Sequence, residues 1–159
     1  LTGSPAPDTP RGGGLDDPAG AFVTLRERAD DRLRGCIGQI EAVSAVADAV
    51  ADAAVSAAVR DPRFPAMTPA ELGEVTIEIS VLSPLRRVDG PREIEVGTHG
   101  IYLRNRGRAG LLLPQVAAER EWDVHTFLTQ TCYKAGLGGD CWRDPNTEIL
   151  IFSAQIFSE

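Results

Sequence analysis

The sequence lacks an excess of basic residues. It has 16 Lys and Arg against 23 Asp and Glu, which gives a formal net charge of −7 over 159 residues. Proteins that bind along a nucleic-acid backbone need a concentrated basic surface. The charge balance therefore argues against nucleic acid as a partner, although a local group of arginines could still bind one phosphate or carboxylate.

Cysteine is also scarce, and its spacing excludes common cysteine-based sites. The three cysteines are Cys36, Cys132 and Cys141, and no two of them form a C-x-x-C pair. Neither a structural zinc site nor a thioredoxin-like redox site is therefore indicated. An odd, low number of cysteines is not typical of a disulfide framework and favours a reducing compartment. We expect a cytoplasmic protein that needs no cofactor.

Long hydrophobic runs are absent. The longest apolar stretches are far shorter than a membrane span, so we expect no membrane as a partner. The first residues do not show the positive and then apolar order of a signal peptide. The length favours one domain, which is large enough to bury a core without disulfides.

The first 20 residues are rich in Pro and Gly and offer little to bury. This composition predicts a disordered or linker-like tail over residues 1–20 and an ordered domain over 21–159. A native tail, a junction with another module and a truncated chain are all compatible with this opening.

Hydrophobic periodicity predicts strands with a few inserted helices. Ser44 is expected to cap the first helix, and Thr68 to Glu71 match a capping box. Strands without a regular βαβ alternation favour an α+β fold with a largely antiparallel sheet over a doubly wound fold. The expected strands are 21–26, 33–41, 74–82, 99–103, 109–113 and 148–157, and the expected helices are 44–60, 114–120 and 123–136.

The most unusual segment is Leu33-Arg34-Gly35-Cys36-Ile37-Gly38. The two glycines allow the backbone to approach a ligand closely, and the adjacent Arg34 can lower the thiol pKa of Cys36. A nucleophilic or metal-binding cysteine needs such an environment. The alternative is a β-bulge with a small buried cysteine, because no histidine lies nearby in the sequence to act as a base.

Two further charged candidates lie between this segment and the middle of the chain. Arg63 lies between two prolines, and its fixed direction could clamp a carboxylate or phosphate. The alternative is a salt bridge to an acid such as Asp61. Glu78, on the polar face of a strand, could pair with Arg34 or Arg63 or act as a general base, the alternative being a solvated face.

The later part of the chain offers two more candidates. His99, at a strand start, could act in acid–base chemistry with Cys36, or could be a hydrogen-bonded structural residue. Gln115 follows Pro114 at a helix start, where free N–H groups could hold an anion. A metal site could be assembled from Cys36, His99 and Glu78, but the spacing does not require one, so no metal is expected. Cys132 is expected in the core, and Cys141 is assigned no role.

Several blocks, in order over residues 21–157, resemble the AMMECR domain family, named for a chromosomal region linked to Alport syndrome, midface hypoplasia and elliptocytosis. They are LRGCIG at 33–38, DPRFP at 61–65, MTPAEL at 67–72, IEISVLSP at 77–84, VGTHGIYLR at 96–104, LLPQVA at 112–117 and FLTQTCYKAGL at 127–137. Family members usually begin with a helix of apolar and basic residues, which the Pro/Gly-rich opening replaces here.

The resemblance implies an α+β fold of two unequal lobes, with the signature residues gathered at a cleft. Family members often occur beside or fused to Memo-type and radical-SAM proteins, which suggests such proteins as partners. Two hypotheses follow: a module that binds a small anionic ligand, nucleotide, peptide or partner protein, or an enzyme with Cys36 as nucleophile or acid. The expected catalytic residues are Cys36, His99 and Glu78, and the expected ligand-binding residues are Arg34, Gly35, Gly38, Asp61, Arg63 and Gln115.

Overall fold

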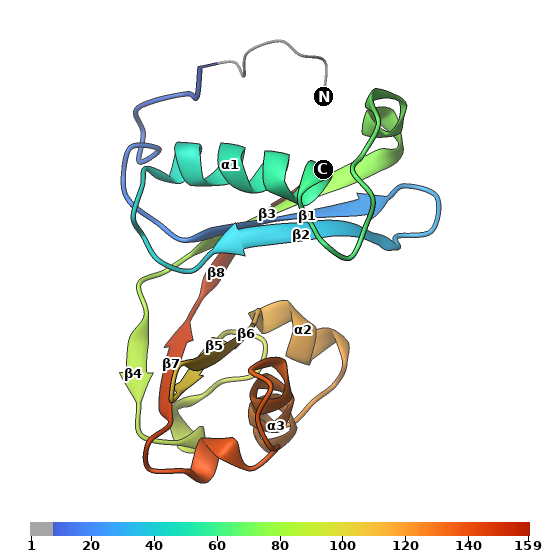
Figure 1. The fold of residues 1–159 in the computed structure, drawn as a ribbon. Coiled ribbons are helices and arrows are strands. Elements are labelled where there is room, and N and C mark those ends of the chain that lie inside the picture. Colours follow the sequence, from blue (N-terminus) through green and yellow to red (C-terminus); the bar gives the residue numbers. More distant parts are fainter. Residues whose placement is uncertain (1–7) are drawn as a thin grey trace. The chain divides into compact units, whose positions relative to one another are not determined.

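The chain divides into two compact units, each built on its own antiparallel sheet (Figure 1). The structure is a computed structural model that describes residues 8–159, so part of the predicted tail, residues 1–7, lies outside the described residues. Unit 1 holds the described residues up to Leu82 together with Gln155–Glu159, and unit 2 holds Ser83–Ala154. The predicted α+β class with antiparallel pairing is confirmed.

Unit 1 is a four-stranded sheet with one α-helix along one face (Figure 1). The central strand β1 pairs antiparallel with β2 and β3. Side chains alternate along these strands, so Val23 and Leu25 share a core with Ala53 and Ala57 of the helix. Its elements are β1 (Ala21–Glu27), β2 (Leu33–Gln39), α1 (Val46–Val59), the 3-10 helix η1 (Pro69–Glu74), β3 (Val75–Leu82) and β8 (Ala154–Ser158), with strand order β2-β1-β3-β8.

Gly35 is the point of closest approach between β2 and α1. A Cβ atom at this position would lie 2.2 Å from the backbone oxygen of Ala57, which is far inside van der Waals contact. The glycine is therefore explained by helix packing, and it is what allows the helix to lie so close to the strand that carries Cys36.

We expect Gly35→Ala to lower the free energy of unfolding by about 1–3 kcal/mol, because α1 must shift to admit the methyl group. Urea denaturation followed by circular dichroism measures this. Gly73→Ala is the matched control, since a Cβ there meets nothing within 4 Å. Equal effects of the two substitutions would contradict the packing explanation.

The start of α1 is capped differently from the prediction. The N-cap residue is Ala45, which makes no side-chain cap, and the Ser44 hydroxyl instead accepts a hydrogen bond from Gln39 Nε2 at 3.3 Å. The first helical N–H groups of Val46 and Ala47 donate to the backbone oxygens of residues 17 and 15, at 2.9 and 3.2 Å. Ser44 was the wrong cap because this preceding segment supplies the acceptors that a helix start requires.

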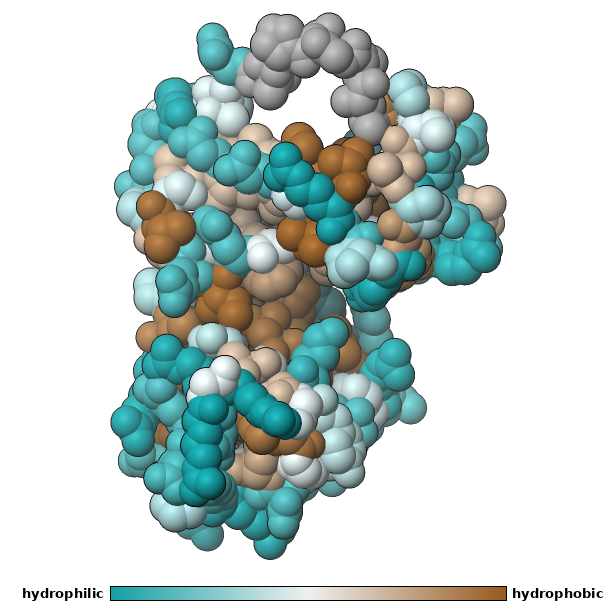
Figure 2. Space-filling model, viewed as in Figure 1, coloured by the Kyte–Doolittle hydropathy of each residue, from teal (hydrophilic) through white to brown (hydrophobic). Residues whose placement is uncertain are grey.

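Unit 2 is a second four-stranded sheet that packs against a helix. Helix α3 contacts β5 and β6, and Phe127, Leu128 and Cys132 bring its fully buried face into the core. On the face drawn in Figure 2, hydrophilic residues cover much of this unit's surface. Its elements are β4 (Arg86–Val88), the 3-10 helix η2 (Pro91–Glu93), β5 (Gly100–Asn105), β6 (Arg108–Leu112), α2 (Pro114–Glu119), α3 (Val124–Lys134), the 3-10 helix η3 (Cys141–Arg143) and β7 (Glu148–Phe152), with strand order β4-β7-β5-β6.

The single strand predicted over 148–157 is two strands in two different sheets. Strand β7 lies in the sheet of unit 2 and β8 in the sheet of unit 1. The break falls at Ser153, whose N–H donates to Ser83 Oγ and whose carbonyl accepts from the Ser83 N–H, both at 2.9 Å. Burial changes at the same point: 149–152 are buried, whereas 155–158 are exposed.

Candidate functional site

A row of polar side chains crosses three strands of unit 1. Thr24 of β1 lies directly opposite Cys36 of β2 and directly opposite Glu78 of β3. The next row, Val23 and its partners, faces α1, so these three side chains lie on the other face of the sheet. Thr24 is buried, and Cys36 and Glu78 are half-buried. The structure thus brings Cys36 and Glu78 to one face, with Thr24 between them.

Cys36 is held at three points. Its backbone N–H donates to Asp61 Oδ2 at 2.9 Å, and its carbonyl oxygen accepts from Arg63 Nη2 at 3.1 Å. Its thiol sulfur accepts a hydrogen bond from the Thr24 hydroxyl at 3.4 Å. The strand position is therefore fixed by two charged side chains, and the thiol has a hydroxyl as its hydrogen-bond neighbour.

Asp61 and Arg63 form a two-pronged ion pair across the turn that follows α1. Arg63 Nε donates to Asp61 Oδ1 at 2.9 Å, and Nη2 donates to Oδ2 at 2.7 Å. These bonds, together with the N–H groups of Cys36 and Arg63, hold the pKa of the Asp61 carboxyl well below its usual range and raise the pKa of Arg63. The salt bridge considered as the alternative for Arg63 is therefore present.

Asp61 is a positioning residue, because its side chain is only 1% exposed and both oxygens already accept hydrogen bonds. Arg63 differs, since its side chain is 48% exposed. The ligand-binding role predicted for Asp61 would require it to give up bonds that hold Cys36, whereas the same role for Arg63 would not.

Arg34 is buried and pairs with Glu71 of η1. Its Nε and Nη2 donate to Glu71 Oε1 at 3.0 and 2.9 Å. Glu71 also accepts from the N–H and hydroxyl of Thr68, which confirms the predicted capping box. The ion pairs of Arg34 and Arg63 are thus made with Glu71 and Asp61, each of them an acid of a neighbouring turn. Arg34 anchors β2 to η1.

The bonds from Thr68 and then Arg34 lower the pKa of Glu71 to about 2, from 4.5 for an unperturbed carboxyl. The folded-state pKa is depressed, so its stabilising contribution is present above pH 4.5 and is lost as the pH falls towards 2. We expect the melting temperature of Glu71→Gln to fall less than that of the wild type between pH 5 and pH 3. Glu74→Gln, at the end of the same 3-10 helix, should keep the wild-type dependence of melting temperature on pH. If melting temperature falls equally with pH in the wild type and both variants, Glu71 is not the group responsible.

His99 and Gln115 lie in unit 2. His99 Nδ1 accepts a hydrogen bond from the Glu95 N–H at 3.0 Å, and the His99 N–H donates to the Glu95 oxygen at 2.8 Å. This is the hydrogen-bonded structural role left open by the sequence. Gln115 is half-buried near the start of α2. Their membership in one site with Cys36 stays a prediction.

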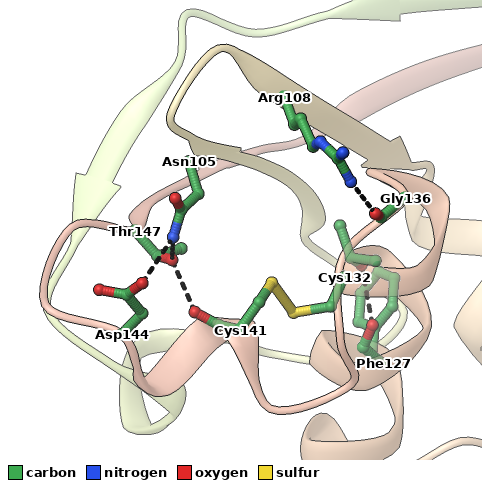
Figure 3. The surroundings of a disulfide bond; sticks show 9 residues. Asn105, Arg108, Phe127, Cys132, Gly136, Cys141, Asp144 and Thr147 are labelled. Atoms are coloured by element: carbon green, nitrogen blue, oxygen red, sulfur yellow. Dashed lines mark hydrogen bonds between the residues drawn. A yellow bond between two sulfur atoms is a disulfide. The ribbon is translucent and has the colours of Figure 1, made fainter.

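Cys132 and Cys141 form a disulfide, with Cα atoms 5.8 Å apart (Figure 3). Cys132 is in the core, as predicted, but Cys141 now has a role that the sequence did not reveal. The disulfide removes the basis for inferring a reducing compartment, because two of the three cysteines are paired and Cys36 is the free one. A signal for this bond was present in the sequence. The two cysteines are nine residues apart, and between them α3 ends and the chain turns at the left-handed Gly136.

Residues 8–159 contain no group of three or more His, Cys, Asp and Glu side chains placed to hold a metal ion. No helix in this range combines the length and the apolar character that crossing a membrane requires.

The family model for AMMECR1 matches residues 2–157. The chain belongs to the AMMECR1 family. A protein from Methanopyrus kandleri is 47% identical over 152 residues, which cover 91% of this chain and 73% of the relative. A protein from Thermococcus kodakarensis is 46% identical over 163 residues, covering 98% and 78%. The crystal structure of the uncharacterised protein PH0010 from Pyrococcus horikoshii has a TM-score of 0.92 and 39% identity, covering 99% of this chain and 82% of that one.

Two residues of this candidate site were not identified from the sequence. Thr24 was treated only as part of a strand, and Glu71 only as part of a capping box. Thr24 could have been found by aligning the first two strands about their turn, which sets it opposite Cys36. The pairing of Glu71 with Arg34 depends on tertiary contact between β2 and η1, for which the sequence holds no local signal.

Proposed function

We propose that this AMMECR1 chain is a binding module for a small ligand that carries an anionic group, with Arg63 beside strand β2 as its anchor. The observation that carries this proposal is that Arg63 is held rigidly and yet half exposed. A guanidinium group fixed in place before binding loses little side-chain entropy when an anion arrives.

The unused donors of Arg63 indicate where an anion would bind. A guanidinium group has five N–H donors. Three are used, one on Nε for Asp61 and two on Nη2 for Asp61 and Cys36. The two remaining N–H donors are both on Nη1, and they make no hydrogen bond within residues 8–159. The stacking of the group on Phe64, at 5.5 Å, further restrains it.

The surroundings of Cys36 favour binding over catalysis. A nucleophilic cysteine needs a base or a cation that stabilises its thiolate. Within unit 1, the hydrogen-bond neighbour of the Cys36 sulfur is the Thr24 hydroxyl, and this unit contains no histidine. The guanidinium of Arg63 donates to the backbone oxygen of Cys36 and also interacts with its side chain, so a cation lies beside the thiol but unit 1 supplies no histidine as a base. In this proposal, Cys36 and Thr24 shape the surface beside the anion.

The test is capture of small molecules from a cell extract by the purified chain, followed by mass spectrometry. We expect Arg63→Ala to lower retention of the bound anion at least about tenfold, which is the effect of losing a charge-assisted hydrogen bond. Arg63→Lys should also lose most retention, because lysine lacks the planar fork. The control is Arg60→Ala, which removes an exposed arginine close by in the chain. Retention that is unaffected by Arg63→Ala would refute the proposal.

The second candidate function is an enzyme that uses Cys36, with Glu78 or His99 moving protons. It is favoured by one observation, the free and half-buried thiol in a tightly held strand. Iodoacetamide labels Cys36 alone while the disulfide is intact. A labelling rate that is already maximal well below pH 8 would support a thiolate and the enzyme, whereas a rate that rises through the ordinary thiol range would support the binding module.

A further inference from the structure

Unit 2 contains a cavity of about 600 Å³ that is lined in part by Cys141 of the disulfide. It lies between the β5–β6 hairpin and the loop that follows α3, and its size suits a small ligand. A smaller cavity of about 360 Å³ shares the tip of the hairpin with it. None of the residues in the proposed AMMECR1 site of unit 1 lines either one.

Three arginines line the larger cavity, and none of them makes an ion pair in the described part of the chain. Arg108 Nη1 donates to the carbonyl oxygen of Gly136 (Figure 3). The Arg143 guanidinium lies 4.6 Å from the centre of the Trp142 ring. Arg106 makes no side-chain hydrogen bond or salt bridge within residues 8–159, and it interacts with Asp144 only through charge at longer range. Guanidinium groups without carboxylate partners are available to an incoming anion.

The acids of this cavity offset the arginines only in part, because Asp144 is engaged first by hydrogen bonds and interacts with Arg106 only through charge. Asp144 is occupied, because it accepts from Asn105 Nδ2 at 3.1 Å and from the backbone N–H and Nδ2 of Asn146 at 2.8 and 2.9 Å. Asp140 is the other lining acid. Three guanidinium groups against two carboxylates leave one net positive charge, in a chain whose net charge is −7.

The walls of the cavity are held in place before any ligand binds. The hairpin turns through Arg106 and Gly107, both in the left-handed region with φ of 47° and 80°. Asn105 is buried and also donates to Thr147 Oγ1 at 2.7 Å, and the Thr147 hydroxyl in turn donates to the Cys141 oxygen at 2.6 Å. The disulfide ties Cys141, which lines the cavity, to Cys132 at the buried end of α3 (Figure 3). Such a preformed site loses little entropy on binding.

We propose that this cavity is a second binding site, for a small molecule that carries a phosphoryl group. Three guanidinium groups from two separate segments suit a tetrahedral group with several terminal oxygens, whereas one planar carboxylate is satisfied by a single arginine fork. A nucleic acid does not fit, because Asp140, Asp144 and Glu148 lie among the arginines of the two cavities and would repel a continuous phosphate backbone.

The test is titration of the whole chain with inorganic pyrophosphate, followed by ¹H–¹⁵N spectra. We expect shifts of the Gly107 and Gly138 amides and the Trp142 indole. Arg106→Gly should weaken binding about tenfold or more while preserving the turn, because glycine favours its positive φ. Arg143→Ala should act similarly. Asp140→Asn should strengthen binding, because it removes a negative charge from the cavity.

Arg87→Ala, at an exposed arginine on β4, should leave affinity within about twofold, since single exposed charges act weakly at a distance in salt. Phenyl phosphate and inorganic pyrophosphate separate a site for phosphate esters from one for inorganic phosphoanhydrides, and preferential binding of either supports the proposal. Malonate binding as tightly as pyrophosphate, an equal loss with Arg87→Ala, or the absence of shifts at these residues would overturn it. Arg63→Ala should change nothing here, so the two proposed sites can fail independently.

Discussion

Replacing Asp61 by asparagine is expected to destabilise the chain by about 3 kcal/mol, the cost typical of removing one partner from a buried charged network. Asp61 accepts four hydrogen bonds, two on each oxygen, from Cys36 N, Arg63 N, Arg63 Nε and Arg63 Nη2. An asparagine replaces one oxygen by an NH₂ group. In either orientation this group meets two donors, so at least two bonds are lost and buried N–H groups remain unpaired.

Urea denaturation at pH 7 measures this loss, and hydrogen exchange of the Cys36 amide reports it locally, because that N–H donates directly to Asp61. Asp52→Asn is the control. Asp52 is an exposed acid of α1, so the same chemical change is made there away from the Asp61–Arg63 turn. A loss below about 1 kcal/mol, which is no more than an ordinary hydrogen bond contributes, would show that the ion pair does not hold β2.

Cys141→Ser is expected to destabilise unit 2 by about 2.6 kcal/mol, which is the chain-entropy value for a sequence separation of nine. The disulfide ties the buried end of α3 to η3, and Trp142 directly follows Cys141. Both tryptophans of the chain, Trp122 and Trp142, belong to unit 2. Tryptophan fluorescence during urea denaturation therefore follows the unit in which the bond lies.

A dithiol reductant provides the internal check. It should destabilise the wild type and Cys36→Ser to the same extent, and it should leave Cys141→Ser unchanged, because that variant has no disulfide to reduce. If the reductant also destabilises Cys141→Ser, or leaves the wild type unaffected, the stability of unit 2 does not depend on this bond.

Local patterns predicted those elements whose cause is local. The first two strands, the capping box at Thr68 and the start of the helix at Asp123 are all determined within a few residues, and the structure shows the Asp123 side chain accepting from Thr126 N at 2.7 Å. The three-residue β4 was missed because its pairing with β7 is set by distant sequence. Ser44 has the right chemistry for a cap, but the first N–H groups of α1 bind backbone oxygens of a distant segment, which no local pattern reveals.

The candidate site was predicted only in part for the same reason. Cys36 and Glu78 were expected to belong to one site, and the alternation of β3 correctly separated its polar and apolar faces. The partners of the charged groups were harder to predict from the sequence, because Arg34 pairs with Glu71 across 37 residues and Cys36 with Asp61 across 25. Arg63 and Asp61, only two residues apart in a proline-constrained turn, were paired correctly as one alternative.

The division of residues 148–158 between two sheets has a consequence for how the chain is made. Unit 2 is one uninterrupted segment, whereas unit 1 receives its fourth strand, β8, only from residues that follow all of unit 2. During synthesis on the ribosome, unit 2 is therefore complete while β3 still has an open edge. Unpaired strand edges attract other chains. Nascent AMMECR1 chains stalled between residues 83 and 154 should accordingly be more prone to aggregation than the released protein. The edge of β3 is covered once β8 pairs with it.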